Sequence, residues 1–389
     1  MMDIKLYGQV ELIPHTANLN RVANWVGIGK LKYVLSMWER TERYYHNIQH
    51  LTEMLEQYSK ADLSKFNELE KDALLCAIVY HDAVYDPRAE HPQNEIKSRE
   101  LWELHLASCT DSHLIQATRI SHGFEEPKDG LKKAVSALID ATQNHTKVPS
   151  SELEKLFIRW DLWSLASDDL TVLIDAERRV LKEYQFHDYE DYRIGRIGIL
   201  ESFKKTIYEI NPDSKIESLI QYVKARKLRI GIYAGSFYPM HTGHYSIIKR
   251  AEKVFDKIII ATGKNPLKSA DPKRGEYTLR LIQEILPYHQ IESFGDDLLT
   301  NYVQSKRTEY VEPTVIKGLG RSGDYEDEKM QMRYMEDMDP TINMAFFISD
   351  RRFDYVSSTG ARIVEAINPD TYSKYALGNW PDAEEKLKS

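Results

Sequence analysis

Residues 229–256 read RIGIYAGSFYPMHTGHYSIIKRAEKVFD, and this stretch decides the fold of the second half of the chain. The apolar run 230–234 predicts a buried strand, and the run 235–239, with its glycine and proline, predicts a turn that ends it. Apolar residues at helical spacing follow, and a second apolar run, 257–263, predicts another strand. A strand, a helix and a strand in this order indicate a parallel sheet with a right-handed crossover.

The turn between the first strand and the helix has the composition of a phosphate site. Gly235 lets the backbone approach a ligand closely, and the helix start offers free N–H groups and the positive end of a dipole. His241 and His244 lie at the same helix start, where imidazole donors can hold a triphosphate and stabilise charge on phosphorus. One histidine near a helix start is usually a cap or a surface residue. Two in H-x-G-H, directly after an apolar strand, favour phosphate transfer.

These residues resemble the nucleotidyltransferase superfamily with a (T/H)-x-G-H signature, in particular the phosphopantetheine adenylyltransferases. The resemblance runs from residue 229 to about residue 380 and rests on motifs in the family's order: Gly235-SFYPMHTG-His244, Asn265-PL-Lys268, Asp297-LLTNYV-Gln304, Val315-IKGLGRSGDYEDEKMQ-Met332 and Val356-SSTGA-Arg362. It implies a Rossmann-like, doubly wound parallel-sheet domain. The implied reaction transfers AMP from ATP to a phosphomonoester, 4′-phosphopantetheine in this family, and yields dephospho-coenzyme A and pyrophosphate.

Site roles follow from this resemblance, motif by motif. It implies that His244 stabilises the pentacoordinate state and that His241 supports the triphosphate, with Lys268 as a further catalytic group and Mg²⁺ accompanying ATP. Contacts with ATP or with the substrate are implied for these residues: Gly235, Ser236, Phe237, Leu298, Leu299, Lys317, Gly318, Arg321, Glu328, Ser357, Ser358, Thr359 and Arg362.

The chain departs from the family pattern at three positions. Tyr238 stands where the family has Asp, Lys317 replaces an Arg, and Gly320 replaces a second Arg, with Arg321 one place later. Lysine keeps the charge but not the fork of donors, so phosphate contacts change while the reaction class does not. Nicotinamide mononucleotide is an alternative substrate, because H-x-G-H is the commoner form in its adenylyltransferases. The Asp297-LLTNYV segment argues against that alternative.

Length and composition set the broad class. The chain has 389 residues, which favours at least two domains, and its 42% hydrophobic and 29% charged residues are typical of a soluble globular protein. A net charge of −8 argues against a nucleic-acid partner. Two cysteines define neither a disulfide framework nor a metal site. With no apolar run long enough to span a membrane and a polar start at residues 1–10, we expect a cytoplasmic protein without a membrane partner; a homo-oligomer is left open.

The sequence predicts an all-α domain over residues 1–209, a linker over 210–228 and the adenylyltransferase-like domain over 229–389. Helical periodicity begins near Leu19, and no convincing strand precedes Arg229. Residues 72–85 predict the most buried helix of the first domain. In the last domain, strands expected at 290–294, 314–318 and 344–349 alternate with helices, which is typical of a doubly wound sheet.

Four residues of the first domain form a candidate metal site: His46, His81, Asp82 and Asp161. Imidazole nitrogen with carboxylate oxygen suits Zn, Mn, Fe or Mg, and such a metal can activate water for attack on a phosphoester. Taken singly, each residue has an ordinary structural explanation, such as a core histidine or a helix cap.

In order, they resemble the H…HD…D pattern of the HD superfamily of metal-dependent phosphohydrolases. The surrounding residues are similar to one branch of predicted hydrolases over about residues 30–208, through Arg43-YYHNIQ-His50, Tyr80-HDAVY-Asp86, Asn94-EIK-Ser98, Ala117-TRIS-His122 and Tyr192-RIGRIGI-Leu200. This resemblance implies an HD helical bundle, a bound divalent metal, and hydrolysis of a small nucleotide-like or coenzyme-like phosphoester. A non-catalytic regulatory or scaffold module that binds a metal is the alternative.

Accessory residues of the candidate metal site remain open between two interpretations. Arg43, Arg193 and Arg196 either anchor a phosphate or pair with local acids such as Glu183 and Asp191. Second-shell or acid–base roles are predicted for His50, Glu95 and His122. Three further histidines match no motif and are expected at the surface: His105, His113 and His145.

Overall fold

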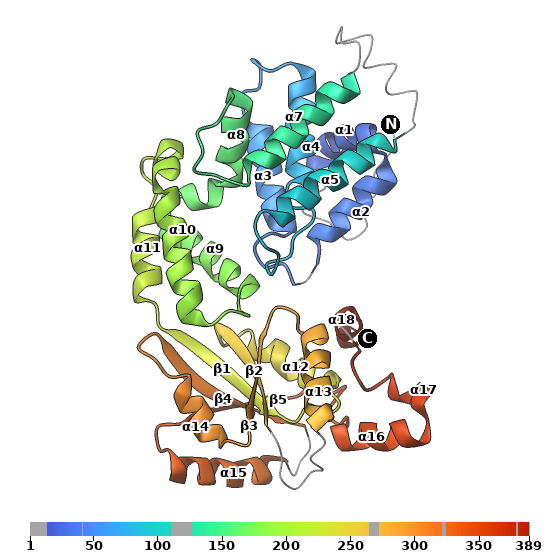
Figure 1. Cartoon of the computed structure of the whole chain (residues 1–389), viewed down its shortest axis with the longest axis vertical. Coiled ribbons are helices and arrows are strands. Elements are labelled where there is room, and N and C mark those ends of the chain that lie inside the picture. Colours follow the sequence, from blue (N-terminus) through green and yellow to red (C-terminus); the bar gives the residue numbers. More distant parts are fainter. Residues whose placement is uncertain are drawn as a thin grey trace. The chain divides into compact units, whose positions relative to one another are not determined.

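The protein is described by a computed structural model, which covers residues 14–40, 42–109, 127–263, 272–320, 324–378 and 380–388. Two compact units compose it (Figure 1). The first runs to Glu183 and also contains Arg196–Gln221, whereas the second contains Tyr184–Gly195 and the chain from Tyr222 onward. The predicted site residues His122, Lys268 and Arg321, and also His113, lie outside the described residues.

The first unit is helical, as the sequence predicts, and α4 (Glu68–Tyr80) lies at its centre (Figure 1). Six helices contact α4: α1 (Thr16–Val26), α2 (Ile28–Trp38), α3 (Ile48–Lys60), α5 (Gln93–Ala107), α7 (Pro127–Ala141) and α8 (Glu152–Asp161). The 3-10 helix η2 (Trp163–Ala166) and α9 (Leu170–Glu183) complete this unit, while α10 (Tyr189–Ile210) and α11 (Ile216–Ala225) each belong in part to both units.

Local sequence explains why α4 occupies the core. Asn67 and Glu70 form a reciprocal capping box that satisfies the first free N–H groups of the helix. Every residue from Ala73 to Tyr80 is buried, so the helix is apolar around its whole circumference. Its last turn is also anchored, since the Trp38 indole donates to the Val79 carbonyl at 2.9 Å. The helix therefore delivers the following residues, His81 and Asp82, into the interior of the unit.

The second unit contains a five-stranded parallel sheet in the order β3-β2-β1-β4-β5, which confirms the predicted sheet (Figure 1). Its strands are β1 (Leu228–Gly235), β2 (Lys257–Gly263), β3 (Gln290–Gly295), β4 (Val311–Leu319) and β5 (Asn343–Ile348). The accompanying helices are α12 (Thr242–Ala251), α13 (Pro272–Ile285), α14 (Leu299–Ser305), α15 (Asp324–Met338), α16 (Ser358–Ile367), α17 (Pro369–Tyr372) and α18 (Trp380–Lys388). The strand order reverses between β1 and β4, so ligands are expected at the carboxyl ends of these two strands.

The division between the units differs from the predicted one. Residues 184–195 belong to the second unit, although they precede the predicted boundary. Lys257, at the start of β2, donates to the His187 carbonyl, and the Tyr189 hydroxyl donates to the Arg226 carbonyl at 3.3 Å. Helix α10 runs from the second unit into the first without a break. Its helical periodicity therefore continues across the division after Gly195, and the sequence did not indicate a boundary there.

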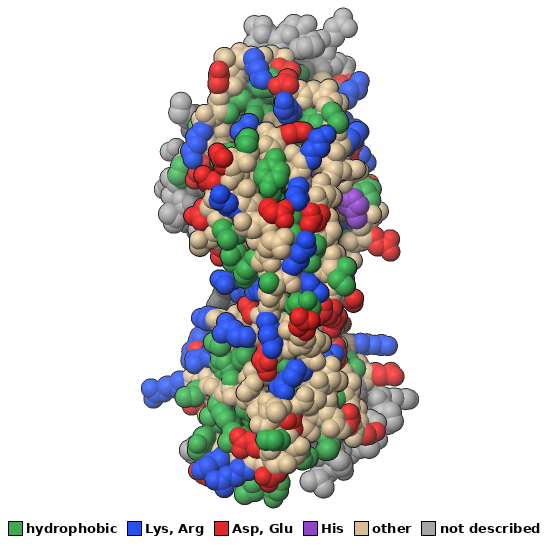
Figure 2. Space-filling model, turned by 90° about the vertical axis from the view of Figure 1, so that its left-hand side faces the viewer, with side chains coloured by type: hydrophobic (Ala, Val, Ile, Leu, Met, Phe, Trp, Pro, Cys, Tyr) green, Lys and Arg blue, Asp and Glu red, His purple; other side chains and the backbone are tan. Residues whose placement is uncertain are grey.

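The surface drawn in Figure 2 carries acidic and basic side chains interspersed with single hydrophobic groups, as is usual for a solvated surface. Across the described ranges, none of the helices has both the length and the apolar character needed to cross a bilayer.

Glu252 provides a test of how the second unit is held together. This carboxylate follows α12 and accepts a hydrogen bond from His289 at 2.9 Å, with Lys249 also 2.9 Å away. Burial alone would raise the pKa of Glu252, but His289 and Lys249 lower it to about 2. The carboxylate therefore stabilises the fold above the pKa of the unfolded chain, near 4.5, and loses this effect as the pH falls towards 2.

We expect Glu252→Gln to destabilise the second unit by about 3 kcal/mol at pH 7 and by progressively less below pH 4.5. Hydrogen exchange of the α12 and β2 amides, compared with wild type at each pH, measures this effect. Glu336→Gln, at an exposed position on α15, is the matched control and should leave the exchange unchanged. Equal protection of α12 in wild type and Glu252→Gln at pH 7 would contradict the assignment.

Candidate functional site

A cavity of about 320 Å³ lies at the carboxyl ends of β1 and β4, where the strand order reverses. Many residues of the predicted transferase site line it: Gly235, Phe237, His241, His244, Lys317, Gly318, Glu328, Ser357 and Ser358. Three separate motifs of the sequence thus supply one cavity, although the first and last are more than 100 residues apart.

The two histidines of H-x-G-H lie against each other at the start of α12. Their rings are stacked with 3.7 Å between centroids, and the His241 N–H donates to His244 Nδ1 at 3.4 Å. A Cβ at Gly243 would lie only 3.0 Å from the His241 ring, so glycine leaves this ring the most room. Because Nδ1 of His244 accepts a hydrogen bond, its proton lies on Nε2, which can donate to a ligand.

Burial sets the charge of His244. Loss of water around the ring, and then repulsion from His241, hold the pKa of His244 well below its ordinary value. The imidazole is therefore neutral at physiological pH and still offers one N–H donor. A neutral donor can stabilise negative charge that develops on phosphate oxygen during a reaction.

Lys317 and Glu328 form an ion pair inside the cavity, with 2.8 Å between Nζ and Oε2. Lys317 comes from the end of β4 and Glu328 from α15, and the lysine also donates to Gln331 at 3.0 Å. The structure therefore brings together two groups for which separate ligand contacts were predicted. A phosphate that binds here would meet a lysine already oriented by a carboxylate.

The segment 357–362 connects α16 to the turn that follows β1. Ser357 caps α16 by accepting from the Gly360 N–H at 3.1 Å, and Ser358 donates to the Pro239 carbonyl at 3.0 Å. Arg362 donates to the Tyr238 carbonyl and, at 2.9 Å, to Thr359 Oγ1. Arg362 and Thr359 thus hold the turn, whereas Ser357 and Ser358 line the cavity itself.

The remaining predicted contacts are not among the residues that line the cavity. Ser236 is exposed on the turn after β1, and Leu298 is 54% exposed just before α14. Leu299 is the first residue of α14, where Asp297 accepts from the Leu298 N–H at 2.7 Å and from Asn301 at 2.8 Å. These hydrogen bonds explain the Asp and Asn of the Asp297-LLTNYV motif as helix-start residues.

Comparison with known proteins agrees with this cavity. The family model described as cytidylyltransferase-like matches residues 232–317. The phosphopantetheine adenylyltransferase of Lawsonia intracellularis is 34% identical over 148 residues, which cover 37% of this chain and 82% of the relative. That of Carboxydothermus hydrogenoformans is 32% identical over 140 residues, covering 35% and 83%, and that of Alkaliphilus metalliredigens is 31% identical over 144 residues, covering 37% and 89%. The chain belongs to the phosphopantetheine adenylyltransferase family.

Membership of the phosphopantetheine adenylyltransferase family makes the second unit a nucleotidyltransferase. The family model lies within that unit, and the relatives account for little more than a third of the chain. The first unit must therefore be interpreted from its own residues.

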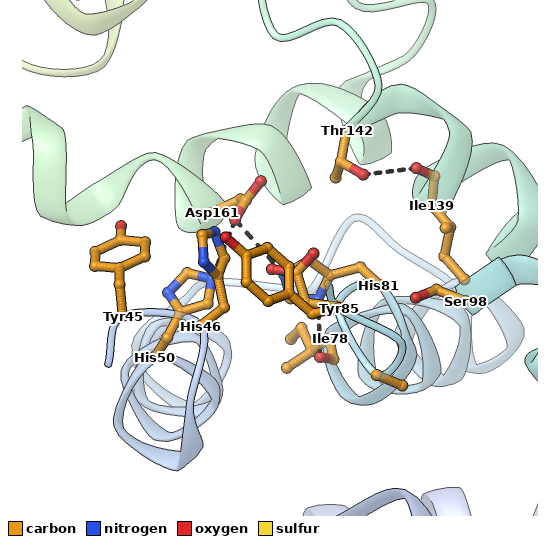
Figure 3. Close-up of polar contacts among 12 residues, drawn as sticks. Tyr45, His46, His50, Ile78, His81, Tyr85, Ser98, Ile139, Thr142 and Asp161 are labelled. Carbon is orange, nitrogen blue, oxygen red and sulfur yellow. Dashed lines mark hydrogen bonds and ion pairs between the residues drawn. The ribbon is translucent and has the colours of Figure 1, made fainter. Parts of the chain in front are cut away.

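A cluster of histidines and carboxylates lies at the end of α4 in the first unit (Figure 3). His81 Nδ1 bonds to the Ile78 carbonyl at 3.1 Å, so Nε2 is left as the acceptor nitrogen. That nitrogen is buried, 3.2 Å from Asp82 Oδ2 and 3.6 Å from Asp161 Oδ1, without an aligned hydrogen-bond partner among the described residues. His50, His81 and Asp82 each offer a ligand atom, all within 4.8 Å of one another, which fits a divalent metal.

Electrostatics in the cluster are typical of a cation site. Burial lowers the pKa of His81, but the charges of Asp82 and Asp161 outweigh burial and hold it well above its ordinary value. Burial raises the pKa of Asp161, yet hydrogen bonds from His145 and His50, together with the nearby His81, hold it well below its usual range. The two carboxylates are therefore ionised and require positive charge nearby.

Two of the histidines expected at the surface are not there. His145 Nε2 is 2.7 Å from Asp161 Oδ2, on the opposite carboxylate oxygen from His50, and its side chain is only 19% exposed. His105 is buried and bonds through Nδ1 to the Tyr80 hydroxyl at 2.9 Å. Both expectations were wrong because each partner lies on another helix, which sequence spacing cannot reveal. His145 is the site residue that sequence reasoning missed.

His46 and His50, one helical turn apart in the sequence, do not lie on the same helix. Asn47 is the extended N-cap of α3, so His46 precedes the helix. His46 Nδ1 bonds to Glu183 at 2.7 Å, while His50 Nε2 lies 3.2 Å from Asp161 Oδ1. His46 thus has a different partner from the other histidines of the cluster.

The three predicted anchor arginines have partners within the protein. Arg43 donates to the carbonyls of Asp82 and Ala83, both at 2.8 Å, and thereby fixes the turn after α4. Arg196 pairs with the buried Glu177 at 2.8 Å. Arg193 belongs to the second unit, where it pairs with Glu190 at 3.2 Å and stacks on the Tyr310 ring.

Local acids therefore pair with both Arg193 and Arg196, each within its own unit. The acids are Glu190 and Glu177, not the Glu183 and Asp191 suggested by the sequence. Glu95 remains near the cluster, and its burial and the charge of Asp82 raise its pKa.

His244→Ala should lower the turnover of adenylyl transfer by about 10²-fold, because one donor to the developing phosphate charge is lost. ATP affinity should stay nearly unchanged, as measured by calorimetric titration beside steady-state kinetics. His91→Ala, an exposed histidine in the first unit, is the control. Turnover close to wild type in His244→Ala would remove this residue from the mechanism.

Proposed function

We propose that the second unit transfers AMP from ATP to 4′-phosphopantetheine, forming dephospho-coenzyme A and pyrophosphate. The H-x-G-H cavity carries this proposal, because its donors converge where a triphosphate would bind. Support for the acceptor comes from the names of the relatives and from the Asp297-LLTNYV segment at the start of α14.

In this mechanism, the substrate's phosphate oxygen attacks the α-phosphorus of ATP in line with departing pyrophosphate. No side chain needs to form a covalent bond, so the protein contributes positioning and charge stabilisation. His244 Nε2–H donates to the oxygen on which charge develops, while Lys317 and the starts of α12 and α16 attract phosphates. ATP enters as its Mg²⁺ complex.

The replacement of the family's Asp by Tyr238 is compatible with this mechanism. The turn after β1 is fixed through the Tyr238 carbonyl, which accepts from Arg362, and through the Pro239 carbonyl, which accepts from Ser358. Because these are backbone contacts, they do not depend on the side chain at position 238. The shape of the phosphate site is thus maintained without the carboxylate.

Purified protein with ATP, Mg²⁺ and 4′-phosphopantetheine should yield dephospho-coenzyme A and pyrophosphate, measured by chromatography and a pyrophosphate-release assay. Nicotinamide mononucleotide, tested at the same concentration, should be a much poorer acceptor. A kcat/KM for nicotinamide mononucleotide above that for 4′-phosphopantetheine would overturn the acceptor assignment and leave the reaction class intact.

For the first unit, we propose a metal-dependent phosphohydrolase that acts on a small nucleotide-like or coenzyme-like phosphoester. Its support is the buried, unaligned Nε2 of His81 facing two ionised carboxylates, which fits a divalent cation such as Mn²⁺, Fe²⁺, Zn²⁺ or Mg²⁺. His81, Asp82, Asp161 and one further histidine would hold this cation. When bound, such a cation supplies a Lewis acid that lowers the pKa of a coordinated water.

One observation favours the alternative of a regulatory or scaffold module that binds a metal. The Arg43 guanidinium donates to backbone carbonyls, and that of Arg196 pairs with Glu177. These two predicted phosphate anchors thus already have partners within the protein. Metal binding is common to both functions, and hydrolysis distinguishes them.

Asp82→Ala should remove the metal from the first unit and abolish phosphoester hydrolysis while adenylyl transfer stays at the wild-type level. Elemental analysis measures the metal, and both activities are measured on the full chain. Asp175→Ala, at an exposed carboxylate on α9, is the control. Wild-type protein that holds no metal after reconstitution with Mn²⁺, Fe²⁺, Zn²⁺ or Mg²⁺ would refute the hydrolase.

A further inference from the structure

Glu183, the last residue of α9, has the densest set of hydrogen bonds near the cluster. Its side chain is 1% exposed. Oε1 accepts from the backbone N–H groups of Tyr45 and His46 at 2.7 and 2.9 Å, and Oε2 accepts from His46 Nδ1 at 2.7 Å and the Tyr85 hydroxyl at 3.0 Å. Burial raises the pKa of Glu183, but His46 and these N–H donors outweigh burial and lower it. Because this buried carboxylate accepts four hydrogen bonds, it fixes the position of the segment around His46.

These contacts determine which nitrogen of His46 is available. Nδ1 holds the proton that is donated to Glu183, so Nε2 is the acceptor nitrogen. The ring stacks on Tyr85 with 4.1 Å between centroids and meets the edge of Tyr45 at 4.8 Å. Its rotation is thereby restricted, and Figure 3 shows His46 and Tyr85 beside Asp161.

Exposure separates His46 from the other imidazoles. Its side chain is 22% exposed, whereas those of His50 and His81 are 4% and 1% exposed. His50 Nε2 lies 3.2 Å from Asp161 Oδ1 and joins His81 and Asp82 within 4.8 Å, a group that does not include His46. Of these two histidines, His50 is the buried one whose Nε2 lies beside Asp161, and His46 is the more open one.

We propose that His50, rather than His46, is the imidazole that joins His81, Asp82 and Asp161 around the metal. His46, oriented by Glu183, instead contacts the substrate or the attacking water through Nε2. Glu183 is then a positioning residue, because it acts only through His46. This proposal rests on the metal-dependent function proposed for the first unit, and it reverses the assignment of the first histidine in the H…HD…D pattern.

Mn²⁺ binding to the full chain without ATP distinguishes the two histidines. We expect His50→Ala to weaken Mn²⁺ affinity by at least 10²-fold in equilibrium dialysis, and His46→Gln and Glu183→Gln to stay within about threefold of wild type. If His46 were a ligand, Glu183 would be its outer-shell partner, and Glu183→Gln should cost 10- to 100-fold in Mn²⁺ affinity. His91→Gln is the control, and far-UV circular dichroism checks that each variant is folded.

Hydrolysis of bis(p-nitrophenyl) phosphate at saturating Mn²⁺ tests the positioning role. His46→Gln and Glu183→Gln should each lower kcat by about 10²-fold, and the double variant should be no slower than either single variant, because the two residues act as a unit. If Glu183→Gln does not fold, the comparison of His46→Gln with His50→Ala still decides which histidine binds metal.

Two results would overturn this inference while the hydrolase proposal remains. One is a loss of Mn²⁺ affinity in His46→Gln as large as that in His50→Ala. The other is wild-type Mn²⁺ affinity in His50→Ala. Multiplicative losses of kcat in the double variant would overturn the positioning role of Glu183. A wild-type chain that takes up no Mn²⁺ would refute the proposed function and this inference together.

Discussion

Charged groups removed from water must be paired, and this constraint shapes both units of the protein. In the first unit, the carboxylates of Asp82, Asp161 and Glu183 are mostly shielded from solvent, and each has an imidazole beside it. In the second, Glu252 is paired with His289, and Lys317 with Glu328. Each pair joins residues from different elements, so the same contacts that compensate for desolvation also fix the positions of the site residues.

The two sites surround their histidines with opposite kinds of charge. His244 has another imidazole as its neighbour and little water, so its pKa is lowered and it remains a neutral donor beside an anion site. His81 faces two carboxylates, so its pKa is raised and its pocket attracts positive charge. The pKa of the same residue type is thus shifted in opposite directions by its surroundings in the two units.

The transferase fold was predictable because its signals are local. Within a short stretch, an apolar strand is followed by the glycine turn, by H-x-G-H and by a second apolar strand. In the parallel sheet, β1 and β4 are neighbours, so their carboxyl ends meet at one edge. The start of β4 was missed, since Pro313 reads as a strand breaker although it lies in register with Ile230.

Features that depend on distant contacts could not be predicted. His145 reaches Asp161 from a loop after α7, and no pattern in the surrounding residues marks it. Spacing also could not separate His46 from His50, because the extended N-cap Asn47 turns one of them away from the helix. The family motifs identified the cluster, but the partners of its arginines became visible only in three dimensions.

Because residues 184–195 belong to the second unit, the two units cannot be exchanged, in evolution or by engineering, by cutting the chain at one place. Two domains joined end to end can be exchanged by one recombination event, whereas here the chain changes units after Glu183, after Gly195 and after Gln221. A single crossover at residue 210 would separate Lys257, which is only 2% exposed, from the His187 carbonyl that accepts its hydrogen bond. Exchange of either unit intact therefore requires that the segment 184–195 be transferred together with the transferase unit.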